Sequence, residues 1–136
     1  MSGRQILRQL AWIFGVAVVL FVSLWIGFAT QSCRAWRAGE KALAEGDESA
    51  AQTCFERSIR SHCPFNTWGQ RSAVHLEAMA EGYERNGQTE RAISAYESLM
   101  TSLAAIDTGW SPSRRARIEQ LERKVLSLRR ELKKAK

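Results

Sequence analysis

The sequence has few of the residues from which enzyme active sites are built. His62 and His75 are its only histidines, and no serine or cysteine stands in a recognisable nucleophile motif. No glycine-rich phosphate loop follows a strand, because no stretch of the chain predicts a convincing strand. We therefore expect a protein that is not an enzyme and that has no cofactor.

Cysteine is also scarce. The three cysteines, Cys33, Cys54 and Cys63, are an odd number. Cys54 and Cys63 together with His62 and His75 could be proposed as zinc ligands, but their spacing matches neither C-x-x-C nor H-x-x-x-H, so we expect no metal site. On a continuous helix Cys54 and Cys63 would lie about 13 Å apart, beyond the reach of a disulfide. The cysteines therefore indicate no redox compartment.

Charge is absent from one long stretch, LAWIFGVAVVLFVSLWIGFA at residues 10–29. A helix of these 20 residues would be about 30 Å long, which matches the hydrocarbon core of a bilayer. Twelve of them are Leu, Ile, Phe or Val, which favours insertion by about 4 to 7 kcal/mol. Trp12 and Trp25 lie near its two ends, where aromatic rings favour the headgroup level. The stretch predicts a single membrane-spanning helix.

A cleaved signal peptide is the main alternative for this stretch. Gly27 and Ala29 are small residues at the spacing that a signal peptidase reads. The apolar region of a signal peptide usually has about 7 to 15 residues, and this one is longer. A buried core helix is excluded, because 136 residues with a polar remainder cannot enclose one. A secreted protein after cleavage therefore stays open beside the membrane protein.

The charges that flank the span bear on its orientation. Arg4 and Arg8 precede it, whereas Arg34, Arg37 and Lys41 follow it, so the positive charges on the two sides nearly balance. A short basic tail before a first apolar helix resembles a signal anchor. We expect the N-terminus inside the cell and the remaining domain on the non-cytoplasmic, periplasmic side.

Charge of opposite sign dominates the two remaining parts of the chain. Residues 39–107 hold eleven acidic and six basic residues, whereas residues 114–136 hold ten basic and three acidic ones. The length outside the membrane leaves room for one small domain and an extra element. We place the tail and membrane helix in residues 1–31, a helical domain in residues 32–108 and a basic C-terminal helix in residues 109–136.

Helical periodicity begins after the span. Apolar and small residues recur at three and four positions in residues 35–43, and Gly46 and Asp47 then interrupt the pattern. A second run follows, with the inner stripe Ala50, Ala51, Cys54, Phe55, Ser58 and Ile59. Two helices joined by a tight turn are expected.

The same pattern recurs 41 positions later, which predicts an internal repeat of helical hairpins. The turn glycine Gly46 aligns with Gly87, and both can adopt a left-handed conformation at a helix end without the cost of a side chain. Small residues that let helices approach align next, and then aromatic residues that fill the following layer. These pairs are Ala51 with Ala92 and Phe55 with Tyr96.

Two stretches, GEKALAEGDESAAQTCFERSIRSHCP and AEGYERNGQTERAISAYESLM, share further features. A small residue (Gly39, Ala80) stands seven positions before the turn glycine, an alanine follows the turn, and an aromatic residue comes four positions later. In these features residues 33–102 resemble the tetratricopeptide repeat (TPR) family. The resemblance implies an all-α fold with two TPR-like helical hairpins. Ordinary hairpins of a small helical bundle would give the same periodicity.

The TPR resemblance also implies a ligand groove lined by the first helix of each hairpin. In this chain the groove would present one aromatic residue and four carboxylates, namely Trp36, Glu40, Glu77, Glu81 and Glu84. An acidic surface of this kind favours a basic peptide or a basic partner helix. Solvated glutamates on helix surfaces are the competing interpretation.

The C-terminal part predicts one more helix, which begins with Ser111 as N-cap and Pro112 in the first turn. Apolar residues then repeat at heptad spacing, at Ile118, Leu121, Val125, Leu128 and Leu132. The seam covers about two heptads, so both a short coiled coil and a helix that caps the second hairpin are consistent with it. Its basic residues could contact anionic lipid, or nucleic acid on a ribosome, but no aromatic residue is interleaved, so nucleic acid is disfavoured.

Both ends of the chain carry patterns that could support a parallel homodimer. Small residues at a spacing of four lie on one ridge of the apolar helix, at Ala11, Gly15, Ser23 and Gly27. The β-branched Ile118 and Val125, alternating with leucines, favour parallel pairs. Each ridge could equally pack on another protein of an assembly.

These features favour a single-pass membrane-anchored, TPR-like scaffold or accessory subunit that mediates protein–protein contacts in a membrane complex. Its expected partners are membrane lipid and other protein subunits. A membrane tether that works through the basic C-terminal helix is the alternative.

Overall fold

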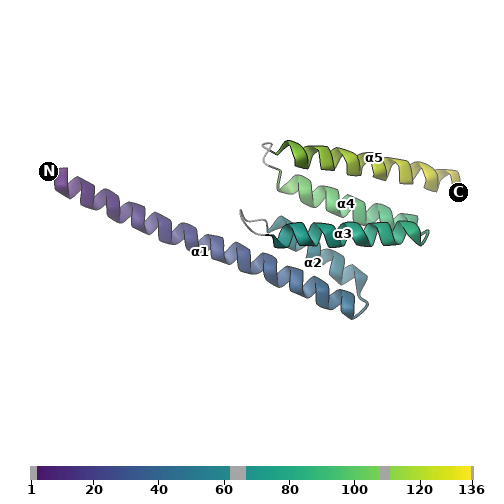
Figure 1. The fold of residues 1–136 in the computed structure, drawn as a ribbon, viewed down its shortest axis with the longest axis horizontal. Coiled ribbons are helices and arrows are strands. Elements are labelled where there is room, and N and C mark those ends of the chain that lie inside the picture. Colours follow the sequence, from purple (N-terminus) through teal and green to yellow (C-terminus); the bar gives the residue numbers. More distant parts are fainter. Residues whose placement is uncertain (1–2, 62–66, 108–110, 136) are drawn as a thin grey trace.

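The computed structural model describes residues 3–61, 67–107 and 111–135, in which all regular secondary structure is helical. Five helices follow one another along the chain (Figure 1). They are α1 (Gly3–Ala44), α2 (Glu48–Arg60), α3 (Trp68–Arg85), α4 (Thr89–Ala105) and α5 (Pro112–Ala135). The expected all-α class is thus confirmed.

Helix α1 is a single unbroken rod of 42 residues. Its first half extends away from the other helices, and its second half packs against α2 (Figure 1). The segment Gln9–Ala44 contains a window long and apolar enough to cross a membrane, and none of that window is buried by the rest of the chain. The boundary expected between residues 31 and 32 falls inside this helix, where Ser32 is the first buried residue.

The two expected turns close in the same way. Gly46 and Gly87 have positive φ angles of 79° and 71°, which a glycine adopts without side-chain strain. After each glycine, the next amide donates to a carbonyl five residues back: Asp47 to Ala42 at 2.9 Å, and Gln88 to Tyr83 at 2.8 Å. The two turns, which are 41 residues apart, therefore have the same backbone conformation at glycine and the same hydrogen bond.

The helix that follows the first turn has a side-chain cap. The Asp47 carboxylate accepts from the backbone N–H of Ala50 at 2.9 Å and so satisfies one of the free amides at the start of α2. No side-chain cap of this kind is made by Gln88 at the start of α4. Both turns therefore contain a glycine with a positive φ angle, but of the two helices that follow them, α2 has a side-chain N-cap and α4 does not.

The inner positions expected from the repeat form the core. Ala51, Phe55, Ala92 and Tyr96 are all buried, with at most 1% of their surface exposed. The Phe55 ring lies directly against the backbone of Gly39, where an added Cβ would come within 2.6 Å of a ring carbon. Gly39 is thus the small residue that lets α1 and α2 approach around an aromatic ring.

Helix α5 packs against α4 and completes the core (Figure 1). Leu121, Val125 and Leu128 from the heptad seam are buried with residues of α3 and α4, and Leu132 packs at the edge of this cluster. The helix begins at Pro112, as expected from the sequence. Of the two interpretations of the seam, the structure supports the capping helix.

Candidate functional site

Four of the five residues expected to line one groove instead contact side chains on other helices. Trp36 on α1 lies against Trp68 at the start of α3, with ring centres 4.8 Å apart. The guanidinium of Arg71 lies 4.9 Å from the Trp68 ring centre and 6.0 Å from that of Trp36. The indole nitrogen of Trp36 is buried and has no hydrogen-bond partner among the residues that the structure describes. Trp36 therefore joins α1 to α3 instead of presenting an open aromatic surface.

Glu40 lies one turn further along α1 and faces His75 on α3. Its carboxylate oxygen is 3.2 Å from Nε2 of His75. The imidazole in turn stacks on Phe55, with ring centres 5.3 Å apart and planes 9° from parallel. Glu40 is thus part of a second contact that links the first three helices.

Glu77 and Glu84 on α3 face the basic helix α5. Glu77 pairs with Arg117, and Glu84 lies 2.9 Å from the ammonium of Lys124. Glu97 on α4 pairs with Arg129 in the same manner. The sequence suggested a basic helix as the partner of these glutamates, and α5 of the same chain contacts two of them.

Of the three ion pairs to α5, the one between Glu84 and Lys124 also involves Tyr96. The Glu84 carboxylate accepts from the buried Tyr96 hydroxyl at 3.0 Å, and the Lys124 ammonium lies 5.1 Å from the Tyr96 ring centre. The hydrogen bond from Lys124 holds the pKa of Glu84 below its usual value, and the same bond raises the pKa of Lys124. Burial raises the pKa of Tyr96. All three groups therefore keep the protonation states that this contact needs across the ordinary pH range.

Glu81 is the one member of the expected groove that stays exposed without an ion pair in the described part of the chain. The backbone carbonyl of Glu81 accepts from Arg85 Nε at 3.4 Å, but its carboxylate is solvated. Within the described ranges, the five residues thus do not form one continuous acidic groove.

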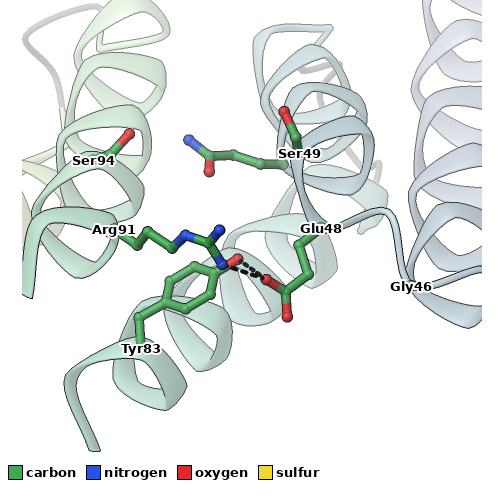
Figure 2. A pocket seen from close by; sticks show the side chains of 7 residues that line it. Gly46, Glu48, Ser49, Tyr83, Arg91 and Ser94 are labelled. Carbon is green, nitrogen blue, oxygen red and sulfur yellow. Dashed lines mark hydrogen bonds and ion pairs between the residues drawn. The ribbon is translucent and has the colours of Figure 1, made fainter. Parts of the chain in front are cut away.

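A polar pocket that the sequence did not indicate lies between α2, α3 and α4 (Figure 2). Its volume is about 430 Å³. The Tyr83 hydroxyl donates to Glu48 Oε2 at 2.8 Å, and Arg91 Nη1 lies 3.6 Å from the same oxygen. Ser49 and Ser94 line the pocket on its α2 and α4 sides.

The electrostatics of this pocket centre on Tyr83. Burial, together with the bond to Glu48, raises the pKa of Tyr83 to about 12, and nearby Arg91 opposes the shift. The phenol therefore stays neutral and keeps donating to Glu48 at physiological pH. The pocket presents one carboxylate, one guanidinium and several hydroxyls, which suits a polar segment with both donors and acceptors.

One signal in the sequence could have drawn attention to the pocket. Tyr83 aligns with Ala42 in the repeat, so the second hairpin has a large aromatic residue where the first has a small one. Its phenol crosses to α2 and reaches Glu48. Which carboxylate it would reach depends on how the two hairpins stack, which the repeat alone does not specify.

The remaining expected sites lie at the ends of the fold. The ridge residues Ala11, Gly15, Ser23 and Gly27 are exposed on the apolar half of α1, and an added Cβ at Gly15 or Gly27 would meet none of the described residues within 4 Å. The seam residues Leu121, Val125 and Leu128, by contrast, are buried inside the domain, so this face is not open to a second copy. Homodimerisation therefore stays a prediction that would depend on the α1 ridge.

The candidate metal ligands are only partly described. Cys54 and His75 lie on α2 and α3, whereas His62 and Cys63 fall outside the described residues. Among residues 3–61, 67–107 and 111–135, no three His, Cys, Asp or Glu residues gather as a metal site would require. Cys33 and Cys54 are free thiols.

Comparisons of the chain with family models, curated proteins and solved structures find no match. The resemblance to the TPR family is therefore not confirmed and stays a prediction. What the structure defines is an all-α domain joined to a long apolar helix.

Proposed function

We propose that the chain is a single-pass membrane protein whose TPR-like helical domain acts as a scaffold or accessory subunit in a membrane complex. The observation that supports this most directly is the continuity of α1. The same helix carries the uncharged 20-residue stretch and the residues that pack on α2. A domain joined in this way is held at a fixed height above the bilayer, which suits a protein that positions partners.

The polar pocket of Figure 2 is the proposed contact for such a partner. Glu48 and Arg91 leave about half or more of their side-chain surface exposed, at 50% and 66%. Exposed groups of both signs around a buried phenol can receive a polar peptide segment through hydrogen bonds and complementary charges. We propose the periplasmic side for this domain, as the signal-anchor pattern predicts.

The tether through the basic helix has less support. Arg117, Lys124 and Arg129 already pair with carboxylates of α3 and α4, which leaves Arg130, Lys133 and Lys134 as exposed charges near the end of α5. Three charges are worth about 3 kcal/mol at an anionic surface. We therefore assign the basic helix primarily to holding the domain together.

Copurification of the full chain in mild detergent tests the scaffold proposal. A Ser94→Arg substitution would place a long cation at the rim of the pocket, and we expect it to remove a partner that the parent chain retains. Ala104→Arg is the matched control, because Ala104 is exposed on the same helix and does not line this pocket. Loss of the partner from both variants, or no reproducible partner for the parent, would contradict the proposed contact.

The anchor is tested separately. We expect the protein to resist extraction from membranes by alkaline carbonate and to retain residues 10–29, which mass spectrometry of the purified chain would show. A mature chain that begins near residue 30 and is released as a soluble protein would instead establish the secreted alternative. Protease accessibility of the domain in spheroplasts tests its sidedness, and protection there would refute the periplasmic assignment.

A further inference from the structure

A second cavity lies between α1 and α2, at the point where the apolar half of α1 meets the helical domain. Its volume is about 500 Å³. Helix α1 contributes Gly27, Gln31 and Arg34, and helix α2 contributes Cys54 and Arg57. The cavity thus reaches from the last uncharged residues of α1 to the first packed turn of the domain.

The charge of this cavity is entirely positive. Arg34 and Arg57 both line it, and no acidic residue of the described ranges does. Both side chains belong to exposed residues, and within the described residues neither guanidinium pairs with a carboxylate. This differs from α5, where Arg117, Lys124 and Arg129 all have acidic partners. Two unpaired guanidiniums that line one cavity favour an anionic ligand.

The position of the cavity along α1, relative to the end of the uncharged stretch, indicates the kind of anion. Arg34 comes five residues after Ala29, the end of the uncharged stretch, which places it about 7 Å further along the helix axis. Headgroups occupy about 5 to 8 Å on each side of the hydrocarbon core. Arg34 therefore lies at the level of lipid phosphates, and Gly27 lies at the edge of the hydrocarbon.

We propose that this cavity is a binding site for an anionic phospholipid, with its phosphate between Arg34 and Arg57. The site rests on the proposed membrane span. Guanidinium groups bind phosphate oxygens through paired hydrogen bonds, and the Gln31 amide, about one helical turn before Arg34, provides another donor in the cavity. Gly27 has no side chain, so an acyl chain can lie against the helix below the phosphate.

The preference for an anionic lipid follows from the lining. A zwitterionic lipid carries its own cation near the phosphate, and two arginines without an acidic neighbour would repel that cation. A lipid such as phosphatidylglycerol has no such cation. The bound lipid would also connect α1 to α2 at the membrane surface, next to the hydrogen bonds between Ser32 and Ser58.

Native mass spectrometry of the full chain tests the site, after delipidation and addition of phosphatidylglycerol with phosphatidylcholine in excess. We expect about one phosphatidylglycerol to be retained per chain. The double variant Arg34→Gln with Arg57→Gln should retain it at least about tenfold more weakly, because two charge-assisted contacts are lost. The matched control is Arg37→Gln with Arg60→Gln, which removes the same charge from the same two helices outside the cavity.

The outcomes separate the site from the anchor. Equal loss in the two double variants would show attraction to surface charge only and would overturn the site. Equal retention of phosphatidylcholine would overturn it as well, and displacement by millimolar inorganic phosphate would reassign the cavity to a soluble anion. Carbonate extraction of the parent chain reports on the anchor independently, so a failed anchor and a failed lipid site are distinguishable.

Discussion

Ser32 on α1 and Ser58 on α2 each donate a hydrogen bond to the backbone carbonyl of the other, at 3.0 and 3.1 Å. Both residues are fully buried, and their hydroxyl oxygens are 3.2 Å apart. Ser32 is three residues beyond the uncharged stretch of α1. This reciprocal pair therefore fixes α1 to the domain close to the proposed membrane surface.

The serine pair predicts a measurable contribution to stability. Ser58→Ala removes one buried hydrogen bond and should lower the free energy of unfolding of the domain by about 1 kcal/mol. Thr53→Ala on the same helix removes an exposed hydroxyl that donates to the Ser49 carbonyl of its own helix, and it should be neutral within about 0.5 kcal/mol. Thermal unfolding of the full chain in detergent, followed by tryptophan fluorescence, compares the two. Equal midpoints would show that the pair does not hold α1 to α2.

Gly39 makes a sharper prediction, because an added Cβ would meet the Phe55 ring at 2.6 Å. The ring is fully buried, so either the ring or one of the two helices must shift, and Gly39→Ala should destabilise the domain by about 1 to 3 kcal/mol. Gly82→Ala is the control, since Gly82 lies within α3 and has no atom within 4 Å of the added Cβ. Alanine there should stabilise by up to about 1 kcal/mol through helix propensity. Melting of Gly39→Ala at or above the parent temperature would mean that α1 and α2 pack differently.

Much of this architecture was predictable because it is local. The glycine turns follow from backbone chemistry, and the positions of Phe55 and Tyr96 in the core follow from helical periodicity. The seam from Leu121 to Leu128 is likewise a pattern along one helix, and its burial was expected for a capping helix.

The partners of the charged residues were not predictable in the same way. Periodicity places Glu77 and Glu84 on one face of α3, but it does not say which helix faces them, and the structure places α5 there. The Trp36 contact with Trp68 and the hydrogen bonds between Ser32 and Ser58 depend on how separate helices stack. Periodicity places Ser58 in the inner stripe of α2, but Ser32 is not part of an apolar pattern, so its burial could not be inferred from spacing.

Tyr83 predicts a dependence of stability on alkaline pH. Its pKa rises from an ordinary value of 10.0 to about 12 in the folded chain, so folding favours the neutral phenol. The associated stability is fully present below pH 10 and is lost as the pH rises towards 12, by up to about 2 kcal/mol. Phenylalanine cannot ionise, so in Tyr83→Phe the loss of stability that Tyr83 causes at alkaline pH should disappear. At neutral pH the variant should be less stable than the parent by about 1 kcal/mol, because it lacks the hydrogen bond to Glu48. Unfolding midpoints between pH 9 and 12 compare the two chains, and parallel curves would contradict the proposed environment of Tyr83.

The contact between Lys124 and Glu84 predicts how α5 is held. Lys124→Glu would place a second carboxylate beside Glu84 and the Tyr96 hydroxyl, and it should destabilise the domain by about 1 to 2 kcal/mol at low salt. The loss should shrink at high salt, because both side chains are partly exposed and their repulsion is screened. Adding Glu84→Lys to Lys124→Glu restores a pair of opposite charges and should recover at least half of the lost free energy of unfolding. Arg123→Glu is the matched control, since Arg123 is on the same helix and its guanidinium donates to the Glu119 carbonyl and, within the described ranges, to no carboxylate. If Lys124→Glu and Arg123→Glu unfold at the same temperature and the swap recovers nothing, the apolar seam alone holds α5 in place.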